Sequence, residues 1–580
     1  MLTLGIHPGY HDAVAVIFDD YRMLAAVQLE RLTRVKIDGG RVPDEAIDEC
    51  LAIAGVSRAD VGAVSLGRAA FPSRYYTHLT LPRRAESVAR RAIHREKHKS
   101  MERELVRAGR TDGDGIFDKT RFLAESGFRD DVRLHFFNHH YAHALPCLFH
   151  TDWDNALLYT SDGGGDNVQY SHRNFRNGRI EQGFGGDEGL LEPLRIDSLG
   201  LAYGYATMAL GYKMNRHEGK LTGLAAYGEP TGLDGLARHF DVADDGRVVS
   251  DFPTYAAMSD RIFEIARELS REDMAATAQA LLEEFTLRAV RRLLEIHPAD
   301  HLGLSGGVFG NVALNRRLAR ETGVREIFVY PAMSDSGLAA GGVLQFLLAR
   351  DGIETWLANR YRLDDVYLGR DHGAEIDAVL QADDRFERVA DNSFQATVKL
   401  LAEGRIVALY TKGMEFGPRA LGARSILASP ADVTINETLN DRLGRSEFMP
   451  FAPVIAAADV DEVFDLNAGE RYAARFMTIT CAVHERWRTR IPAVVHVDGT
   501  ARPQIIERPA NPLYFDILAG FKQATGLPVL INTSFNVHEE PIINAPAECA
   551  QALAENRIDY VATELGVYAR RQDPIVTGGA

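Results

Sequence analysis

The pair His139 and His143 is the first feature of the sequence that suggests chemistry. Residues four positions apart lie on one face of a helix, so the two imidazoles could bind one transition metal. The alternative is a helix start whose histidines are satisfied by the surrounding protein. The sequence around them lacks the glutamate of an H-E-x-x-H motif, so a zinc protease is not indicated.

Three loops are rich in glycine and other small residues. They span residues 162–165, 305–311 and 334–337, and the first and third contain Asp162 and Asp335. Glycine lets backbone N–H groups approach a phosphate closely, and a helix N-terminus favours an anion. An aspartate in such a loop could hold a metal or position a phosphate, and a tight turn is the alternative. The loops lack the spacing of a Walker A or G-x-G-x-x-G motif.

Arginines and small polar residues gather in three motifs of the last third of the chain. G-P-R-A-L-G-A-R-S-I contains Arg419 and Arg424, H-V-D-G-T-A-R ends at Arg502, and N-T-S-F-N contains Ser534 and Asn536. A guanidinium group matches phosphate well, and hydroxyl and amide groups on loops suit a nucleotide or an acyl phosphate. Taken singly, each motif could equally be a turn.

The elements that must position these residues follow from hydrophobic periodicity. The start of the chain predicts a β-meander rather than the strand and helix of a nucleotide-binding βαβ unit. The predicted strands span residues 2–6, 13–18, 23–30, 156–161, 301–304, 406–410 and 529–531. The predicted helices span residues 44–54, 273–297, 312–320 and 394–403. The polar segment 356–372 lacks periodicity, so we expect it to link one module, 1–355, to another, 373–580.

Composition limits the class of protein. The chain has 580 residues, of which 46% are hydrophobic and 25% charged, as in ordinary globular proteins. One hydrophobic core rarely extends past about 300 residues, so at least two domains are expected. The formal net charge of −16 disfavours nucleic acid as the main partner. Residues 83–110 are an exception, with ten Lys and Arg against four acidic residues, and predict either a solvated helical face or a flap over an anionic or bulky substrate.

The sequence also bears on the compartment. It has no run of 18 apolar residues, so no membrane span is expected. The first residues lack a basic n-region, and a signal peptide is therefore not expected. The four cysteines are far apart and form no C-x-x-C motif, which favours a reducing, cytoplasmic location.

The motifs taken together, in their order along the chain, resemble the O-carbamoyltransferase family of antibiotic and nodulation-factor carbamoyltransferases. The resemblance runs from about residue 3 to residue 568 and includes H-D-A, H-x-x-x-H, D-G-G-G-D, G-P-R-A-L-G-A-R-S-I and N-T-S-F-N. It implies an α/β protein. The N-terminal module would have an actin-like ATPase fold of duplicated β-sheet halves with helices. The C-terminal module would be a twisted open α/β sheet resembling threonylcarbamoyl-adenylate synthase.

The resemblance implies a reaction in two steps. The C-terminal module would make carbamoyl adenylate from ATP and carbamoyl phosphate, with Mg²⁺, and the N-terminal module would pass the carbamoyl group to a hydroxyl. The implied partner is a small hydroxylated natural product, such as a macrolide, polyketide or aminoglycoside, with no nucleic acid and no membrane; a homodimer is left open. One alternative is a tRNA threonylcarbamoyladenosine-type modifying enzyme. Another is a nucleotide-dependent binding or chaperone protein of the actin-like fold.

The resemblance also assigns residues to sites. The implied metal ligands, with iron(II) expected and zinc or manganese as alternatives, are His139, His143, Asp162 and Asp335. The implied nucleotide and carbamoyl phosphate contacts are Glu218, Lys220, Ser305, Gly306, Gly307, Asn311, Arg419, Arg424, Arg502, Ser534 and Asn536. His11 and Asp12 match the opening H-D-A, and His11 is the candidate general base or hydroxyl positioner, with a structural turn histidine as the alternative. The residues expected to approach the acceptor are Glu30, Arg31 and Lys36.

Two motifs depart from the family pattern. Many members read G-R-M-E-F where this chain has Lys412 before G-M-E-F. Many also have a lysine before R-E-x-F-R-P-F, where this chain has Gly444 and Arg445. We expect Lys412, Arg442 and Arg445 to replace those charges from shifted positions.

Overall fold

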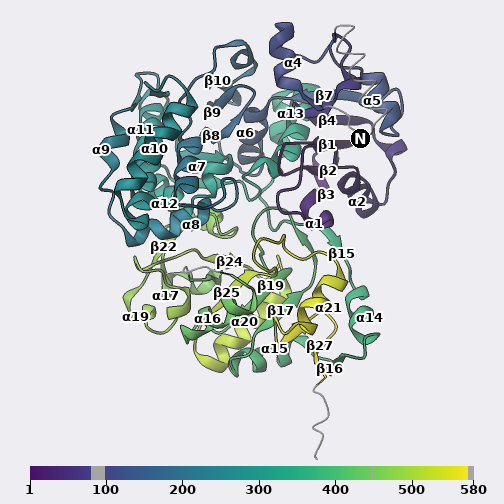
Figure 1. The fold of residues 1–580 in the computed structure, drawn as a ribbon. Coiled ribbons are helices and arrows are strands. Elements are labelled where there is room, and N and C mark those ends of the chain that lie inside the picture. Colours follow the sequence, from purple (N-terminus) through teal and green to yellow (C-terminus); the bar gives the residue numbers. More distant parts are fainter. Residues whose placement is uncertain (80–97, 446–449, 572–580) are drawn as a thin grey trace, which may run out of the picture. The chain divides into compact units, whose positions relative to one another are not determined.

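The computed structural model describes residues 1–79, 98–445 and 450–571, which form two compact units (Figure 1). Unit 1 comprises Met1–Thr33, Ile37–Leu363 and Ala468–Ala473. Unit 2 comprises Arg34–Lys36, Asp364–Asn467 and Ala474–Ala580. The chain passes from unit 1 to unit 2 after Leu363, within the segment 356–372 that the sequence predicts as a linker. That segment contains the end of helix α13 (Leu338–Ala358) and strand β15 (Tyr367–Asp371).

Unit 1 contains two five-stranded sheets with the same strand order. The first sheet runs β3-β2-β1-β4-β7, formed by β1 (Leu2–His7), β2 (Val14–Asp19), β3 (Arg22–Gln28), β4 (Ala63–Gly67) and β7 (Arg133–Phe137). The second runs β10-β9-β8-β13-β14, formed by β8 (Asn155–Gly165), β9 (Val168–Arg176), β10 (Arg179–Phe184), β13 (His301–Ser305) and β14 (Glu326–Val329). In each sheet the first three strands in sequence are antiparallel, and the last two continue from the first in parallel. This repeat is the duplicated arrangement expected of an actin-like fold.

Two helices in unit 1 pack against each other at unusually short range. They are α6 (His139–Phe149) and α13, and α13 also packs against β1 and β4 of the first sheet (Figure 1). A Cβ on Gly341 of α13 would lie 1.7 Å from the carbonyl oxygen of Ala142 in α6, so only glycine allows this approach. The small residues after Asp335 therefore bring the loop 334–337 next to the helix that carries the histidine pair.

The predicted helices and most predicted strands of unit 1 are confirmed. The helices are α2 (Asp44–Ala54), α11 (Arg271–Ile296) and α12 (Val312–Glu321). The third strand is shorter than predicted: β3 ends at Gln28, and the next residues begin the short helix α1 (Leu29–Thr33). The side chain of Glu30 points back into this turn and accepts the backbone N–H of Ile37 at 2.8 Å, which a continued strand would not allow.

Unit 2 is an open eight-stranded mixed sheet flanked by helices, as expected. The strand order is β16-β27-β26-β17-β19-β25-β20-β24. The strands are β16 (Phe386–Ala390), β17 (Val407–Tyr410), β19 (Arg424–Ala428), β20 (Ala452–Ala456), β24 (Gln504–Ile506), β25 (Val529–Ser534), β26 (Tyr560–Ala562) and β27 (Val567–Arg570). Helices α15 (Ser393–Ala402) and α20 (Pro512–Thr525) pack together beside it.

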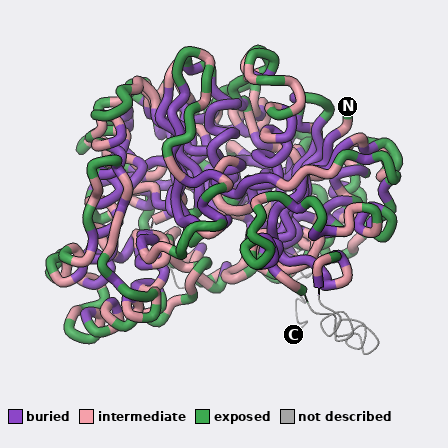
Figure 2. Tube along the Cα trace, turned by 90° about the horizontal axis from the view of Figure 1, so that it is seen from above, coloured by how far each residue is buried: buried purple, intermediate pink, exposed green. Residues whose placement is uncertain are grey.

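Burial follows the sheets of each unit (Figure 2). β4 and β17, for example, are buried at every position, whereas the connecting turns are exposed. Part of the basic segment 83–110 lies outside the described residues; its later part forms β6 (His98–Ser100) and α4 (Met101–Ala108). All four cysteines are buried and unpaired. Among the described helices, none is both long and apolar enough to cross a membrane.

Candidate metal centre and nucleotide site

The N-terminus of helix α6 presents the histidine pair. The side chain of Asn138 caps the helix by accepting the backbone N–H of Tyr141 at 2.8 Å. The backbone N–H of His139 donates to the carboxylate of Asp166 at 2.7 Å. A Cβ on Gly165 would lie 2.3 Å from the ring of His139, so the third glycine of D-G-G-G leaves room for this imidazole. The glycine cluster therefore both forms the loop and leaves space for the His139 ring.

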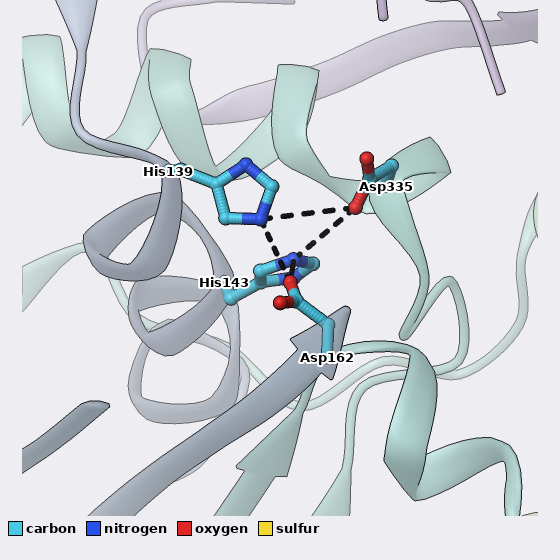
Figure 3. Close-up of side chains that lie close together, drawn as sticks. All are labelled: His139, His143, Asp162 and Asp335. Carbon is cyan, nitrogen blue, oxygen red and sulfur yellow. Dashed lines mark hydrogen bonds and ion pairs between the residues drawn. The ribbon is translucent and has the colours of Figure 1, made fainter. Parts of the chain in front are cut away.

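Four side chains converge at this point, two from α6 and two aspartates (Figure 3). Asp162 comes from the end of β8, and Asp335 from the short turn that begins at Asp335 before α13. Asp162 Oδ2 lies 2.7 Å from His139 Nε2 and 3.1 Å from His143 Nε2. Asp335 Oδ1 lies 3.8 Å and 3.6 Å from the same two nitrogens. One potential ligand atom from each residue lies within 4.8 Å of the others.

The ionisable groups of these four side chains lie close together and are largely shielded from solvent. Burial alone would lower the pKa of His139, but the carboxylates of Asp162 and Asp335 raise that pKa to about 10. Burial alone would raise the pKa of the two carboxyl groups, but the histidines hold the pKa of each well below its usual range. The Nε2 of His143 is buried and has no hydrogen-bond partner among the described residues.

These observations fit a metal ion bound by two imidazoles and two carboxylates. A buried nitrogen without a partner that faces carboxylates is the arrangement expected of a ligand atom. This mixed nitrogen and oxygen donor set suits iron(II), zinc or manganese. The structure thus brings together all four residues that the sequence assigned to the metal.

Ser305 and Gly306 lie against the same centre. The hydroxyl of Ser305 is 3.3 Å from Nδ1 of His143, on the far side of the ring from the ligand atom. Gly306 has φ = 107°, and a Cβ there would lie 2.2 Å from the carbonyl oxygen of Ser161. Gly307, by contrast, has open space at its Cβ position. The loop therefore supports the metal centre on one side and leaves an open position at Gly307.

The other nucleotide residues expected in unit 1 are more engaged with the protein. Asn311 caps α12 by accepting the backbone N–H of Leu314 at 3.1 Å, and its amide donates to Gln279 at 2.8 Å. Glu218 begins α8 (Glu218–Leu224), and burial raises the pKa of its carboxyl group. Lys220 is buried, with its ammonium 6.0 Å from the ring centre of Tyr212. Asn311 thus holds the start of α12, and its contact with the nucleotide stays a prediction.

His11 lies within the electrostatic reach of the metal centre. Its Nδ1 is 3.4 Å from the carboxylate of Asp12, a residue in the left-handed region with φ = 57°. Burial alone would lower the pKa of His11, but the hydrogen bond to Asp12 and the carboxylates of Asp335 and Asp162 raise it to about 9.

The sequence did not identify His7 as a site residue. His7 ends β1, is buried, and its Nε2 lies 3.6 Å from Oδ2 of Asp335. A histidine at the carboxyl end of a largely apolar strand was the signal that could have found it.

The acceptor residues expected from the sequence separate into two groups. Glu30 and Arg31 are buried and form an ion pair at 3.2 Å in unit 1. Lys36 lies in the short segment Arg34–Lys36, which belongs to unit 2. In that segment Arg34 donates to the carbonyl oxygens of Pro541 and Ile542 at 2.7 and 2.8 Å.

In unit 2 the loop that carries Arg419 is organised by Glu415. One oxygen of the buried Glu415 carboxylate accepts the backbone N–H groups of Leu421, Ala423 and Arg424 at 2.8, 2.8 and 3.1 Å. The hydroxyl of Tyr367 also donates to the carbonyl of Leu421 at 2.8 Å. The loop is therefore fixed from within, and it carries the half-buried Arg419.

Arg424 does not share that position. It is fully buried at the start of β19, its guanidinium lies 3.8 Å from the ring centre of Tyr410, and it donates to the carbonyl of Thr411 at 2.7 Å. In this position Arg424 bonds to protein groups, and its contact with phosphate stays a prediction. An arginine that begins a strand and one that lies on a loop look alike in sequence.

Arg445 joins the end of β25, where Ser534 and Asn536 lie. It donates to the hydroxyl of Thr533 at 2.8 Å, to the carbonyl of Ser534 at 2.9 Å and to the side chain of Asn536 at 3.2 Å. Arg442 instead pairs with Asp559 at 2.6 Å. Arg445 therefore lies against Ser534 and Asn536, and its replacement of the family's lysine charge stays a prediction.

The remaining residues expected in unit 2 are Lys412 and Arg502. Lys412 follows β17 with φ = 53°, and the side chains of Lys412 and Arg502 are each partly exposed.

The fold and the site together define a two-unit α/β protein with a His₂Asp₂ centre in its first unit. The family description "Carbamoyltransferase N-terminus" matches residues 2–344, and "Carbamoyltransferase C-terminus" matches residues 398–570. The chain belongs to the carbamoyltransferase family and is a transferase enzyme.

Relatives cover most of the chain. Nodulation protein NolNO of Sinorhizobium fredii is 32% identical over 95% of this chain and 77% of its own. Nodulation protein NolO of Bradyrhizobium diazoefficiens is 32% identical over 73% of this chain and 77% of its own.

Solved structures are more distant. A ROK hexokinase from Thermus thermophilus aligns with a TM-score of 0.33 and 17% identity over 61% of this chain and 100% of its own. Full-length HypF in its phosphate- and nucleotide-bound form aligns with a TM-score of 0.32 and 12% identity over 60% of this chain and 56% of its own. Scores this low support no conclusion about the site.

Proposed function

We propose that this carbamoyltransferase is ATP-dependent and transfers a carbamoyl group, through carbamoyl adenylate, to a hydroxyl of a small natural product. The observation that carries the proposal is the occurrence, in one chain that matches both family regions, of a buried His₂Asp₂ centre in unit 1 and a braced arginine loop in unit 2. The proposal also follows from chemical need: an unactivated carbamate is a poor acyl donor, whereas its mixed anhydride with AMP has a good leaving group.

In the proposed first step, unit 2 binds Mg²⁺–ATP and carbamoyl phosphate and forms carbamoyl adenylate. Arg419, Arg445 and Arg502 would contact phosphate oxygens, because guanidinium donors match them in geometry and charge. Ser534 and Asn536 would complete the site from the end of β25. One water is consumed: it splits carbamoyl phosphate into carbamate and phosphate. A carbamate oxygen then bonds to the α-phosphorus of ATP, and the bond from that phosphorus to pyrophosphate breaks.

In the proposed second step, unit 1 accepts the adenylate and the acceptor. His139, His143, Asp162 and Asp335 would hold a divalent metal, with iron(II) expected, which when bound stabilises charge on the adenylate phosphate and carbonyl. His11 takes the proton of the acceptor hydroxyl as its oxygen bonds to the carbamoyl carbon. The bond from that carbon to the AMP oxygen then breaks, and the products are the carbamate ester and AMP.

The acceptor, whether macrolide, polyketide or aminoglycoside, is identified by direct assay. The protein is incubated with ATP, Mg²⁺, carbamoyl phosphate and a panel of hydroxylated natural products, and intact mass is recorded together with AMP and pyrophosphate. A product heavier by the elements of HNCO, formed only with ATP and carbamoyl phosphate, is the expected result. Carbamoyl transfer without AMP formation contradicts the adenylate route, and modification of tRNA in place of the panel contradicts the small acceptor.

A further inference from the structure

His7 occupies a tightly fitted position beside the proposed metal centre. It is the last residue of β1 and is 5% exposed. A Cβ on Gly9 would lie 2.3 Å from its Nε2, and a Cβ on Gly67 would lie 2.7 Å from its Nδ1. Two glycines, one after β1 and one at the end of β4, therefore leave the space that the imidazole fills.

Neither ring nitrogen of His7 has a hydrogen-bond partner in the described parts of the chain. Leaving a buried polar atom unpaired costs free energy, so such an atom calls for an explanation. The Nε2 of His7 points to Asp335, whose Oδ2 is 3.6 Å away. That distance is slightly too long for a hydrogen bond and short enough for a small rotation of the carboxylate to make one.

The two oxygens of Asp335 face different groups. Oδ1 faces the Nε2 atoms of His139 and His143 at 3.8 and 3.6 Å, whereas Oδ2 faces His7. A carboxylate that binds a metal through one oxygen is commonly held in place by a donor at the other. His7 is placed to be this donor.

We propose that His7 is a positioning residue of the metal centre: its Nε2–H donates to Oδ2 of Asp335 and so keeps Oδ1 directed at the metal. The carboxylate next to Nε2 selects the tautomer with its proton on that nitrogen. This role rests on the metal centre of the proposed function. It is the outer half of a histidine–carboxylate–metal relay, and His7 does not itself touch the ion.

The test compares metal binding by the whole protein and its variants, after removal of metal with a chelator. Zn²⁺ affinity is measured by competition with a chromophoric chelator, and Co²⁺ absorption reports the number and type of ligands. We expect His7→Leu to bind Zn²⁺ about 10- to 100-fold more weakly than the wild type. The intensity and position of its Co²⁺ bands should stay those of the wild type, because the ligands are unchanged.

Two amide variants keep the test decisive if His7→Leu does not fold. His7→Gln carries its amide N–H at nearly the distance of Nε2 and should restore affinity close to that of the wild type. His7→Asn has a shorter side chain that stops short of Asp335 and should bind Zn²⁺ as weakly as His7→Leu. A merely structural role would not separate these two amides.

His150 provides the matched control. It is also fully buried in unit 1 and also lacks hydrogen-bond partners for both ring nitrogens within the described residues, but it packs beside the rings of Tyr330 and Tyr361 rather than beside a carboxylate. His150→Leu should keep the Zn²⁺ affinity of the wild type. If it weakens Zn²⁺ binding as much as His7→Leu does, the effect is general loosening of the core and the proposal is overturned.

Other outcomes separate this role from the proposed function. Equal Zn²⁺ affinity in the wild type, His7→Leu and His7→Asn overturns the role of His7 and leaves the metal centre intact. Loss of a nitrogen ligand in the Co²⁺ spectrum of His7→Leu shows direct ligation and also overturns it. Failure of the wild type to bind either ion overturns the metal centre, and this role falls with it.

Discussion

In unit 2 the carboxylate of Glu415 accepts three backbone N–H groups, whereas in unit 1 the carboxylates of Asp162 and Asp335 face imidazole nitrogens. All three carboxylates lie in or near the protein interior, but the groups that face them differ chemically. Backbone N–H groups satisfy a buried negative charge permanently. An imidazole nitrogen that bears no proton cannot donate to a carboxylate, so a carboxylate that faces such a nitrogen needs a cation.

The difference teaches how to interpret a buried acid. Three backbone N–H groups of its own loop already donate to one oxygen of Glu415, so its role is to hold that loop in one conformation. Asp162 and Asp335 sit beside His143, whose Nε2 lacks a hydrogen bond from any described group, so the cluster is arranged for a ligand that is not protein. Glu415 therefore fixes a loop, whereas Asp162 and Asp335 belong to the candidate metal site.

Removal of a ligand from unit 1 should have the largest effect. We expect His143→Ala to lose metal affinity by more than about 100-fold and to lose carbamoyl transfer, since one of the four ligands is gone. AMP and pyrophosphate formation from ATP and carbamoyl phosphate should continue, because the residues proposed for that step belong to unit 2. The measurements are metal content and both half-reactions, with His150→Leu as control. Full transfer by metal-free His143→Ala protein would refute the assignment.

Loss of the proposed base should have the next largest effect. We expect His11→Ala to slow carbamate formation by about 10²- to 10⁴-fold, the usual contribution of a positioned base. The adenylate would still form and would then decay in water, so the ratio of AMP to carbamate should rise. That ratio is measured in a single reaction mixture. An unchanged rate and ratio would leave His11 as a structural turn residue and direct the search to Asp12, to Glu218, or to His217, which occupies the N-cap position of α8 just before Glu218.

The same comparison can be sharpened from unit 2. Glu415→Gln keeps an oxygen for the loop but removes the charge, and hydrogen bonds to a charged group contribute about 1.5 to 3 kcal/mol. We expect the free energy of unfolding to fall by about that amount and adenylate formation to slow, because Arg419 loses its fixed support.

Two measurements check this loop. Chemical denaturation compares Glu415→Gln with Glu387→Gln, whose side chain is exposed on β16 of the same unit. Transfer from supplied carbamoyl adenylate should be unchanged in both. If Glu415→Gln slowed only that transfer, the division of labour between the units would be wrong.

Helix periodicity alone placed His139 and His143 on one face, because that spacing is local. The two aspartate ligands came from the family resemblance, since sequence spacing does not show which loops a duplicated fold brings together. His7 was missed because a single histidine at a strand end has no spacing signal. The burial of Arg424 was not foreseen, because sequence motifs do not reveal whether an arginine begins a buried strand.

The sequence predicted the fold better than the site. The opening meander and the long helix α11 follow from local patterns of apolar residues, and the structure confirms both. The strand predicted over residues 23–30 ended early because the carboxylate of Glu30 accepts the backbone N–H of Ile37, which is a contact of a turn. The repeated strand order came only from the resemblance, because pairing in a sheet is not local.

The smallest expected effect concerns the pH dependence of unit 1. Burial alone would lower the pKa of His11, but the hydrogen bond to Asp12 and the carboxylate of Asp335 raise it to about 9. A base acts when deprotonated, so the transfer rate should rise with pH until His11 has lost its proton. Asp12→Asn removes a negative charge beside the ring, so the pKa of His11 should fall and the rise should occur at lower pH.

The pH profile is best recorded with supplied carbamoyl adenylate, so that only unit 1 is tested. Both proteins carry the same bound metal, whose charge acts equally on His11, and the difference between their profiles therefore reports Asp12. Asparagine tolerates the left-handed backbone of this position, where φ is 57°, so the turn should persist. A profile that shifts to higher pH, or does not shift, would mean that the proton-accepting group in unit 1 is not His11, because removing a neighbouring carboxylate can only make an imidazole easier to deprotonate.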